Sequence, residues 1–144
     1  MELIFDDMFA PKAPTKHEAF AGLLVLASCS DGEFSDEEAD GFNTIVSRMR
    51  LYRDMDSEEF DGVIDAAIRT VRQNGFDKAM ELFGKALPEA LHKSAFANAC
   101  DLVLADGVVE ASEKEFINKL RRALNLNAEE AQTIAKVMVY KNQG

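Results

Sequence analysis

Two short stretches of this sequence decide the fold: DGEFSDEE at residues 31–38 and DGVVEASE at residues 106–113. Each begins with an Asp-Gly pair, carries an apolar residue at its fourth position and ends in Glu, and each is flanked by segments with helical periodicity. Asp-Gly favours a turn, and acidic residues favour the first turn of a helix. The sequence therefore predicts the same helix-turn-helix unit twice.

The two stretches belong to a longer internal repeat. A shift of 75 residues, 106 − 31, places Asp31 on Asp106 and Glu38 on Glu113. The same shift produces four more identities, at His17/His92, Gly32/Gly107, Asn43/Asn118 and Leu51/Leu126. We therefore predict two pseudo-symmetric halves, about residues 15–75 and 88–141, in a single helical domain at residues 15–144. An apolar N-terminal arm and linker at residues 1–14 precedes this domain.

Capping signals divide the rest of the chain into helices. Capping boxes at Thr15 and Ser35 begin helices that run to about Ser28 and Leu51, Ser57 caps a third, and Asn127 caps the last. Residues 76–86 form a fourth helix after the turn at residues 74–75, a fifth runs from residue 88 to about 105 with a proline in its first turn, and a sixth follows residue 107. The chain is therefore expected to be a compact all-α bundle of about seven helices.

Apolar residues at helical spacing define the predicted core face of each helix. In chain order these residues are Phe20, Leu23, Leu24 and Ala27; Phe42, Ile45, Val46 and Met49; Phe60, Ile64, Ala67, Ile68 and Val71; Phe76, Met80 and Phe83; Leu91, Ala95, Ala99, Leu102 and Val103; Phe116, Ile117, Leu120 and Leu124; and Ala131, Ile134, Ala135, Met138 and Val139.

Composition and charge exclude several classes of protein. The 144 residues include 16 basic and 26 acidic side chains, a net charge of −10, which argues against a nucleic-acid partner. The basic clusters at residues 48–53 and 119–122 are expected to complement helix C-termini. The longest apolar stretch, residues 19–28, is far shorter than the roughly 20 residues that span a bilayer, and the acidic N-terminus does not resemble a signal peptide. We expect a cytoplasmic protein.

The sequence carries no recognisable catalytic motif. It has no Gly-rich phosphate loop, nucleophile elbow or HExxH, and its two histidines lack a catalytic context. Cys29 and Cys100, the only cysteines, are expected to be reduced, buried thiols, since no CxxC or Cys/His cluster is present. We therefore do not expect an enzyme.

The paired DGxxxxxE turns, at matching places in two halves of a small acidic all-α chain, resemble the tellurite-resistance TerB family over roughly residues 17–140. The motif is also similar to the N-terminal TerB-type domain of a membrane-anchored DnaJ-like chaperone. The resemblance implies a stress-response role and an acidic, divalent-metal-binding site where the two motifs meet. Carried over to this sequence, the metal ligands are Asp31, Glu38, Asp106 and Glu113.

The chemistry of four converging carboxylates agrees with a metal site, because such a group repels itself unless a cation or protons neutralise it. Ligands that are all oxygen favour Ca²⁺, Mg²⁺ or Mn²⁺ over zinc or copper. An EF-hand is excluded, because its loop needs oxygen ligands at alternate positions around a central Gly. Asp101 is a candidate fifth acid, whereas His17 and His92 lie 14 positions before their Asp and are poor ligands.

Two functions follow. The leading one is a stress-response module of the TerB type that binds a divalent metal and engages partner proteins, with a membrane-associated complex among the candidates. The alternative is a metal-free protein-protein interaction domain whose acidic turns only cap helices, since each of the four carboxylates also suits a turn or a helix N-terminus.

Overall fold

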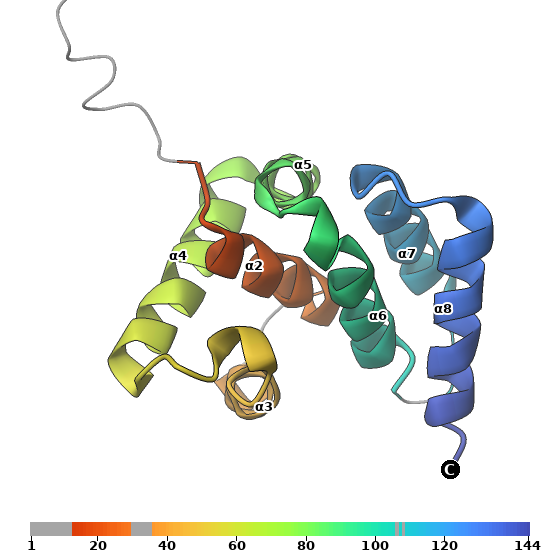
Figure 1. Ribbon diagram of the computed structural model, residues 1–144, viewed down its shortest axis with the longest axis horizontal. Helices are drawn as coiled ribbons and strands as arrows, with labels where there is room; N and C mark the ends of the chain where they lie inside the picture. The colour runs from red at the N-terminus through yellow and green to blue at the C-terminus, as the bar shows by residue number, and fades with distance from the viewer. Residues whose placement is uncertain (1–12, 30–35, 106, 108) are drawn as a thin grey trace, which may run out of the picture.

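The computed structural model describes residues 13–29, 36–105, 107 and 109–144, and only the backbone of residues 36–38. Within these residues the chain forms α-helices and short 3-10 helices and no strand, which confirms the predicted all-α fold (Figure 1). The elements are α2 (Lys16–Ser28), α3 (Asp36–Val46), η1 (Arg50–Tyr52), α4 (Ser57–Asn74), α5 (Phe76–Ala86), η2 (Glu89–Leu91), α6 (His92–Val103), α7 (Ala111–Ala123) and α8 (Ala128–Lys141).

Helix α2 is the centre of the bundle. It begins where predicted, because the Thr15 hydroxyl accepts the Glu18 backbone N–H at 3.1 Å and the Glu18 carboxylate accepts the Thr15 N–H at 3.5 Å. Every residue from 19 to 27 is buried, so α2 has no solvent-facing side over this stretch. A helix that is apolar all round must be surrounded by other helices, and α2 packs against α3, α4, α5 and α6.

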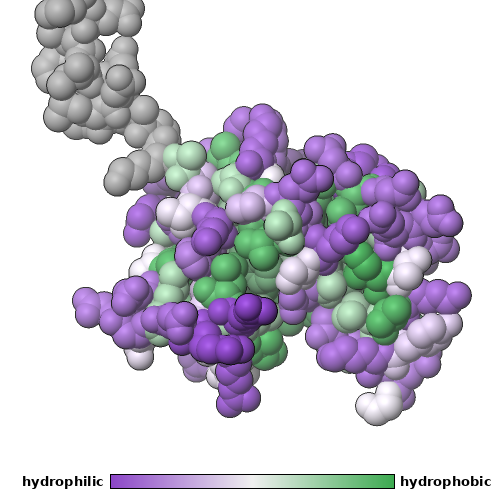
Figure 2. All heavy atoms as spheres, in the orientation of Figure 1, coloured by the Kyte–Doolittle hydropathy of each residue, from purple (hydrophilic) through white to green (hydrophobic). Residues whose placement is uncertain are grey.

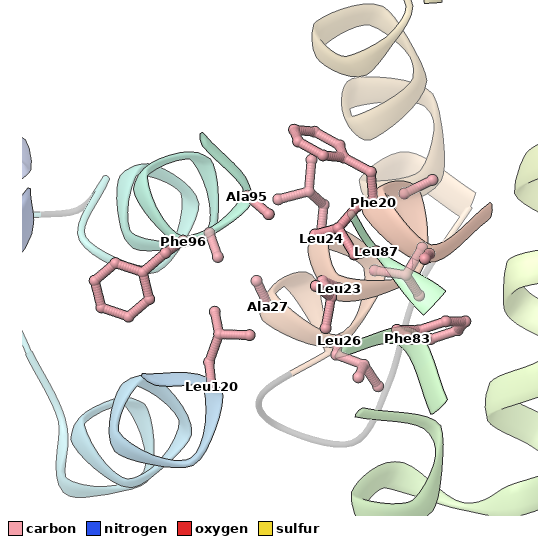
Figure 3. Packing of buried hydrophobic residues seen from close by; sticks show 14 of the residues in the cluster. Phe20, Leu23, Leu24, Leu26, Ala27, Phe83, Leu87, Ala95, Phe96 and Leu120 are labelled. Atoms are coloured by element: carbon pink, nitrogen blue, oxygen red, sulfur yellow. The ribbon is translucent and has the colours of Figure 1, made fainter. Parts of the chain in front are cut away.

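Two glycines allow α5 to lie close to α2 and to α7. The ring of Phe83 lies over Gly22 of α2, where a Cβ atom would be only 2.3 Å from Cζ of that ring (Figure 3 shows Phe83 against α2). The next residue, Gly84, faces α7, where a Cβ atom would lie 2.9 Å from the Ala123 carbonyl oxygen. Helix α5 therefore packs tightly between α2 and α7 because α2 and α5 each carry glycine at the contact.

The ends of α4 test two local predictions. Its N-cap is Asp56, whose carboxylate accepts the Glu59 N–H at 2.8 Å, so the prediction that Ser57 caps this helix was wrong by one residue. The acidic side chain reaches the same N–H group and leaves Ser57 as the first helical residue. At the other end, Gly75 adopts a positive φ of 81° and separates α4 from α5, as predicted.

The predicted fifth helix is shorter than expected at its start and at its end. Pro88 has ψ of 141°, an extended value, and the short 3-10 helix η2 follows it before α6 begins at His92. The proline thus precedes the helix instead of lying in its first turn. Helix α6 ends at Val103, two residues before the predicted Ala105.

Helix α3 ends at Val46, five residues short of the predicted Leu51. Phe42 and Val46 are buried as predicted, but Ile45 is 50% exposed, so its assignment to the core was wrong. The chain turns here because η1 is anchored elsewhere: the buried Tyr52 donates its hydroxyl to the His17 carbonyl oxygen in α2 at 2.7 Å.

The early end of α3 also changes the role of the first basic cluster. Arg48, Arg50 and Arg53 follow the helix, and none lies in its last turn. By contrast, Arg121 and Arg122 lie in the last turn of α7, as predicted. The first cluster therefore needs an explanation other than the helix dipole.

Helix α8 begins at the predicted cap, where the Asn127 side chain accepts the N–H groups of Glu129 and Glu130. Val139 is 37% exposed, so its placement in the core was wrong. All other predicted core residues are buried or packed against the buried cluster.

No helix in the described ranges is both long enough and apolar enough to cross a bilayer.

Candidate functional site

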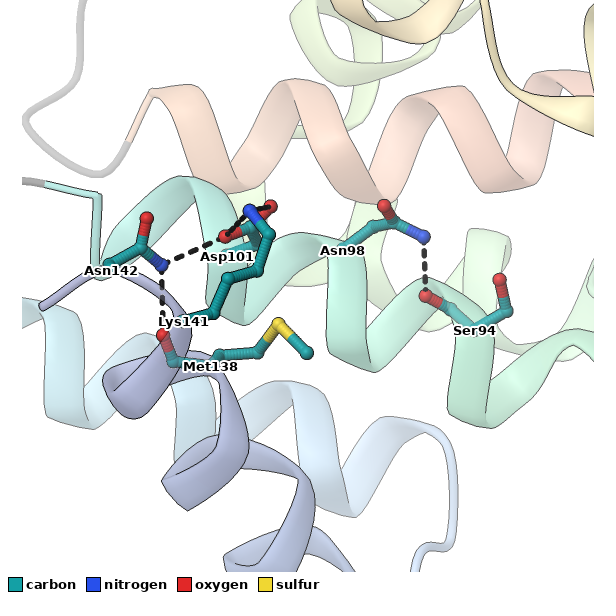
Figure 4. A network of polar contacts seen from close by, with 6 residues as sticks. All are labelled: Ser94, Asn98, Asp101, Met138, Lys141 and Asn142. Carbon is teal, nitrogen blue, oxygen red and sulfur yellow. Dashed lines mark hydrogen bonds and ion pairs between the residues drawn. The ribbon is translucent and has the colours of Figure 1, made fainter. Parts of the chain in front are cut away.

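The two Asp-Gly sequences follow helices that end on the same side of the molecule. Helices α2 and α6 pack against each other, and their N-terminal residues, including Lys16 and Ser94, line one groove. The two helices therefore run in the same direction, and their C-terminal ends lie at a common end, to the left in Figure 4. Two helix C-termini place partial negative charge there, which favours a cation.

The four predicted ligands are described to different extents. Asp31 and Asp106 lie outside the described residues, and for Glu38 only the helical backbone of α3 is described. Glu113 is fully described, in the first turn of α7 and half-buried. The meeting of the four carboxylates therefore stays a prediction.

Glu113 has a defined structural contact. Its Oε1 atom accepts the backbone N–H of Glu110, the N-cap of α7, at 3.0 Å, so Glu113 occupies the third position of a capping box. A carboxylate has two oxygen atoms and about four acceptor positions, and this bond occupies one of them. Glu113 can therefore cap α7 and still bind a cation.

Asp101, the candidate fifth acid, joins α6 to the end of α8. Both of its carboxylate oxygens lie 3.0 Å from Lys141 Nζ, and one also accepts Asn142 Nδ2 at 2.8 Å (Figure 4). Its side chain is 30% exposed, and a cation is already paired with it. Sequence reasoning missed Lys141 and Asn142, because no local pattern connects residues 40 positions apart in the chain.

The other carboxylate pairs lie away from the predicted site. Lys119 binds Asp77 at 3.2 Å and Glu115 at 3.5 Å, and the hydrogen bond to Asp77 raises the pKa of the lysine. Glu81 pairs with two lysines of α5, and its hydrogen bond from Lys85 lowers the pKa of the carboxyl. None of these pairs involves a predicted ligand.

His92 is not available to a metal. Its Nδ1 atom lies 3.0 Å from the Leu124 carbonyl oxygen and its Nε2 atom 2.8 Å from the Leu87 carbonyl oxygen. These carbonyls belong to the residues that end α7 and α5. A neutral ring can donate to one of them and an imidazolium to both. The ring thus clamps two helix ends beside the start of α6.

The two cysteines do not form a disulfide. Cys100 is buried in α6 as predicted, and burial together with the charge of Asp101 raises its pKa to about 12. Cys29, which follows α2, is only partly buried, so the prediction of full burial was wrong for this residue.

Carboxylate oxygens alone would suit a hard divalent cation at the shared end of α2 and α6. Across residues 13–29, 36–105, 107 and 109–144, no three acids, histidines or cysteines come together as a metal-binding group. The predicted metal site, with Asp31 and Asp106 outside these ranges, therefore stays a prediction.

Fold and site together define a class of small acidic all-α proteins, in which two parallel helices end together and each is followed by a DGxxxxxE sequence. The sequence profile described as tellurite resistance protein TerB matches residues 17–136 of this chain. The chain belongs to the TerB family. Neither a curated protein nor a solved structure matches it.

Proposed function

We propose that this chain is a tellurite-resistance-type stress-response module that binds one divalent cation through Asp31, Glu38, Asp106 and Glu113. The cation, Ca²⁺, Mg²⁺ or Mn²⁺, would hold the two Asp-Gly turns in the arrangement that partner proteins recognise. The expected partners are other proteins, and a membrane-associated complex is one candidate. The role is binding, and no residue is assigned a catalytic step.

The parallel packing of α2 and α6 carries this proposal. Because the two helices end at one side, the chain leaves both of them close to the same place, although Ser28 and Val103 are far apart in sequence. Two helix C-termini and the acids that follow them create negative charge that a cation would neutralise. Glu113, in the first turn of α7, has an acceptor position left beside its capping bond, which supports its assignment as a ligand.

A second function, a metal-free interaction domain, is favoured by a specific contact. The hydrogen bond from the Glu110 N–H to Glu113 shows that one of the four acids already has a structural partner. If the other three act in the same way, the acidic turns are helix caps and the cation is not needed.

Thermal unfolding separates these two functions. A ligand that binds only the folded state adds about 2.7 kcal/mol of stability at a concentration 100 times its Kd. For a chain of this size, that corresponds to a rise in Tm of about 5–10 °C. We expect chelator-treated protein to show such a rise with at least one of Ca²⁺, Mg²⁺ and Mn²⁺, and Asp31→Asn/Asp106→Asn to lose it.

The matched control is Asp54→Asn/Asp65→Asn, which removes the same charge at two exposed positions and should keep the rise in Tm. If the midpoint of the wild-type protein is the same with every ion, the metal function is wrong and the acids act only as caps. An equal rise in the wild type and in Asp31→Asn/Asp106→Asn would place the metal elsewhere.

A further inference from the structure

A groove of about 530 Å³ lies between the first turns of α2 and α6, with η1 as its third side. Its charged and titratable side chains are all basic: Lys16, His17 and Arg50. Among the described residues no carboxylate lines it, although the chain has 26 acidic and 16 basic residues. A basic groove in so acidic a protein favours a ligand of opposite charge.

The cations at this groove are available for binding. Lys16 and Arg50 are exposed, and neither makes an ion pair with any residue that the structure describes. Elsewhere, Lys93, Lys119 and Lys141 are each paired with a carboxylate. The first basic cluster, which does not complement the end of α3, thus supplies one of the unpaired charges of the groove.

The base of the groove is apolar and fixed. Phe20, only 2% exposed, belongs to the buried core, and Met49 and Leu91 pack against that core. The hydrogen bond from Tyr52 to the His17 carbonyl holds η1 against α2. In Figure 2 hydrophobic side chains gather in the middle of the face formed by α2 and α6, with hydrophilic ones around them. The groove therefore suits a segment that is both apolar and acidic.

The chain itself contains such a segment. Residues 2–9 read ELIFDDMF, with acids at positions 2, 6 and 7 and apolar residues at positions 3, 4, 5, 8 and 9. We propose that this segment, the chain's own N-terminal arm, binds in the groove between α2 and α6. Its acids would pair with the basic side chains, and its apolar residues would cover Phe20, Met49 and Leu91.

The connection is long enough for this docking. Six residues lie between Phe9 and Lys16 at the edge of the groove, so their Cα atoms are seven steps apart, 16 − 9. Extended at about 3.4 Å per residue, they span up to about 24 Å. A short tether also gives the arm an effective concentration on the order of millimolar, so weak contacts are enough to fill the groove. A partner that used this groove would have to displace the arm.

A tryptophan reporter tests the proposal in the full chain, which has no Trp of its own. In Phe5→Trp, we expect a blue-shifted emission and acrylamide quenching several-fold slower than in a synthetic peptide of residues 1–12 with the same substitution. Adding Lys16→Glu/Arg50→Glu should raise quenching to the peptide's value. The matched control, Arg48→Glu/Arg53→Glu, reverses two nearby charges that do not line the groove and should leave quenching slow.

A second variant, on the arm itself, keeps the test valid if the Lys16→Glu/Arg50→Glu variant misfolds. Asp6→Asn/Asp7→Asn leaves the helical body untouched and should also speed quenching in the Phe5→Trp background. Quenching as fast in the Phe5→Trp protein as in the peptide overturns the proposal. Slow quenching that neither the groove variant nor the arm variant changes places the arm elsewhere and overturns it too. Slow quenching that is lost on dilution assigns the groove to the arm of a second copy and overturns docking within one chain.

Discussion

At Cys100, burial determines the chemistry of a single side chain. Its thiol has a pKa raised to about 12, whereas an unfolded thiol titrates near 8.5. The folded chain therefore keeps a proton that the unfolded chain loses. The resulting contribution to stability is complete below about pH 8.5 and is lost as the pH rises toward 12, at up to about 1.4 kcal/mol per pH unit.

We predict that the free energy of unfolding falls between about pH 9 and 11, and that it falls less steeply in Cys100→Ala. Urea unfolding at each pH measures both slopes. Burial also raises the pKa of Tyr52. Adding Tyr52→Phe to Cys100→Ala should therefore make the fall of the free energy of unfolding with pH shallower still. Identical slopes for the wild type and Cys100→Ala would contradict the prediction.

Residue contacts were predictable from sequence only where they are local. The Thr15 and Asn127 caps involve residues up to three positions apart, so propensity and spacing reveal them. The His92 clamp joins residues up to 32 positions apart, and the Asp101 pair joins residues 40 apart. Only the packing of α6 against its neighbours creates these contacts, and no pattern in the sequence encodes them.

At the scale of elements, the contact of α2 with α5 depends on the absence of one methyl group. A Cβ atom on Gly22 would overlap the ring of Phe83, which is fully buried. We predict that Gly22→Ala lowers the free energy of unfolding by about 1–3 kcal/mol, as overpacked cores do. Chemical denaturation monitored by circular dichroism measures the change.

Gly62, an exposed residue within α4, provides the matched control. A Cβ atom added there would have no neighbouring atom within 4 Å. Gly62→Ala should stabilise the protein by about 0.5–1 kcal/mol, because alanine is the better helix former. Phe83→Leu should recover part of the loss in the Gly22→Ala background. Equal stability of Gly22→Ala and the wild type would show that the ring moves aside at no cost.

Element boundaries were predicted best where a special residue marks them. Gly75, with its positive φ, separates α4 from α5 as the sequence indicated. The end of α3 was missed because it depends on Tyr52 reaching the His17 carbonyl, a tertiary contact that overrides the helical periodicity of residues 47–51. Likewise, the sequence predicted one apolar stripe on α2, whereas four neighbouring helices bury it on every side.

On the scale of the whole molecule, stability should be unevenly distributed. Helix α2 packs against four helices, whereas the main contact of α8 is with α6 alone, and Val137 and Tyr140 of α8 are exposed. We predict that native-state hydrogen exchange is slowest in α2 and much faster in α8, because local opening of α8 breaks few buried contacts. Amide exchange followed by NMR checks the order. Equal protection of the two helices would mean that the chain opens only as one unit.

The burial of α2 on all sides also has a consequence for the making of the protein. During translation, residues 19–27 leave the ribosome well before residues 92–103, which cover one side of them, have been added. Over that interval α2, the most apolar of the described helices, has only part of its final surroundings. The nascent chain therefore exposes an apolar surface of α2 that chaperones can recognise. This exposure ends once α6 has been synthesised and packed against α2.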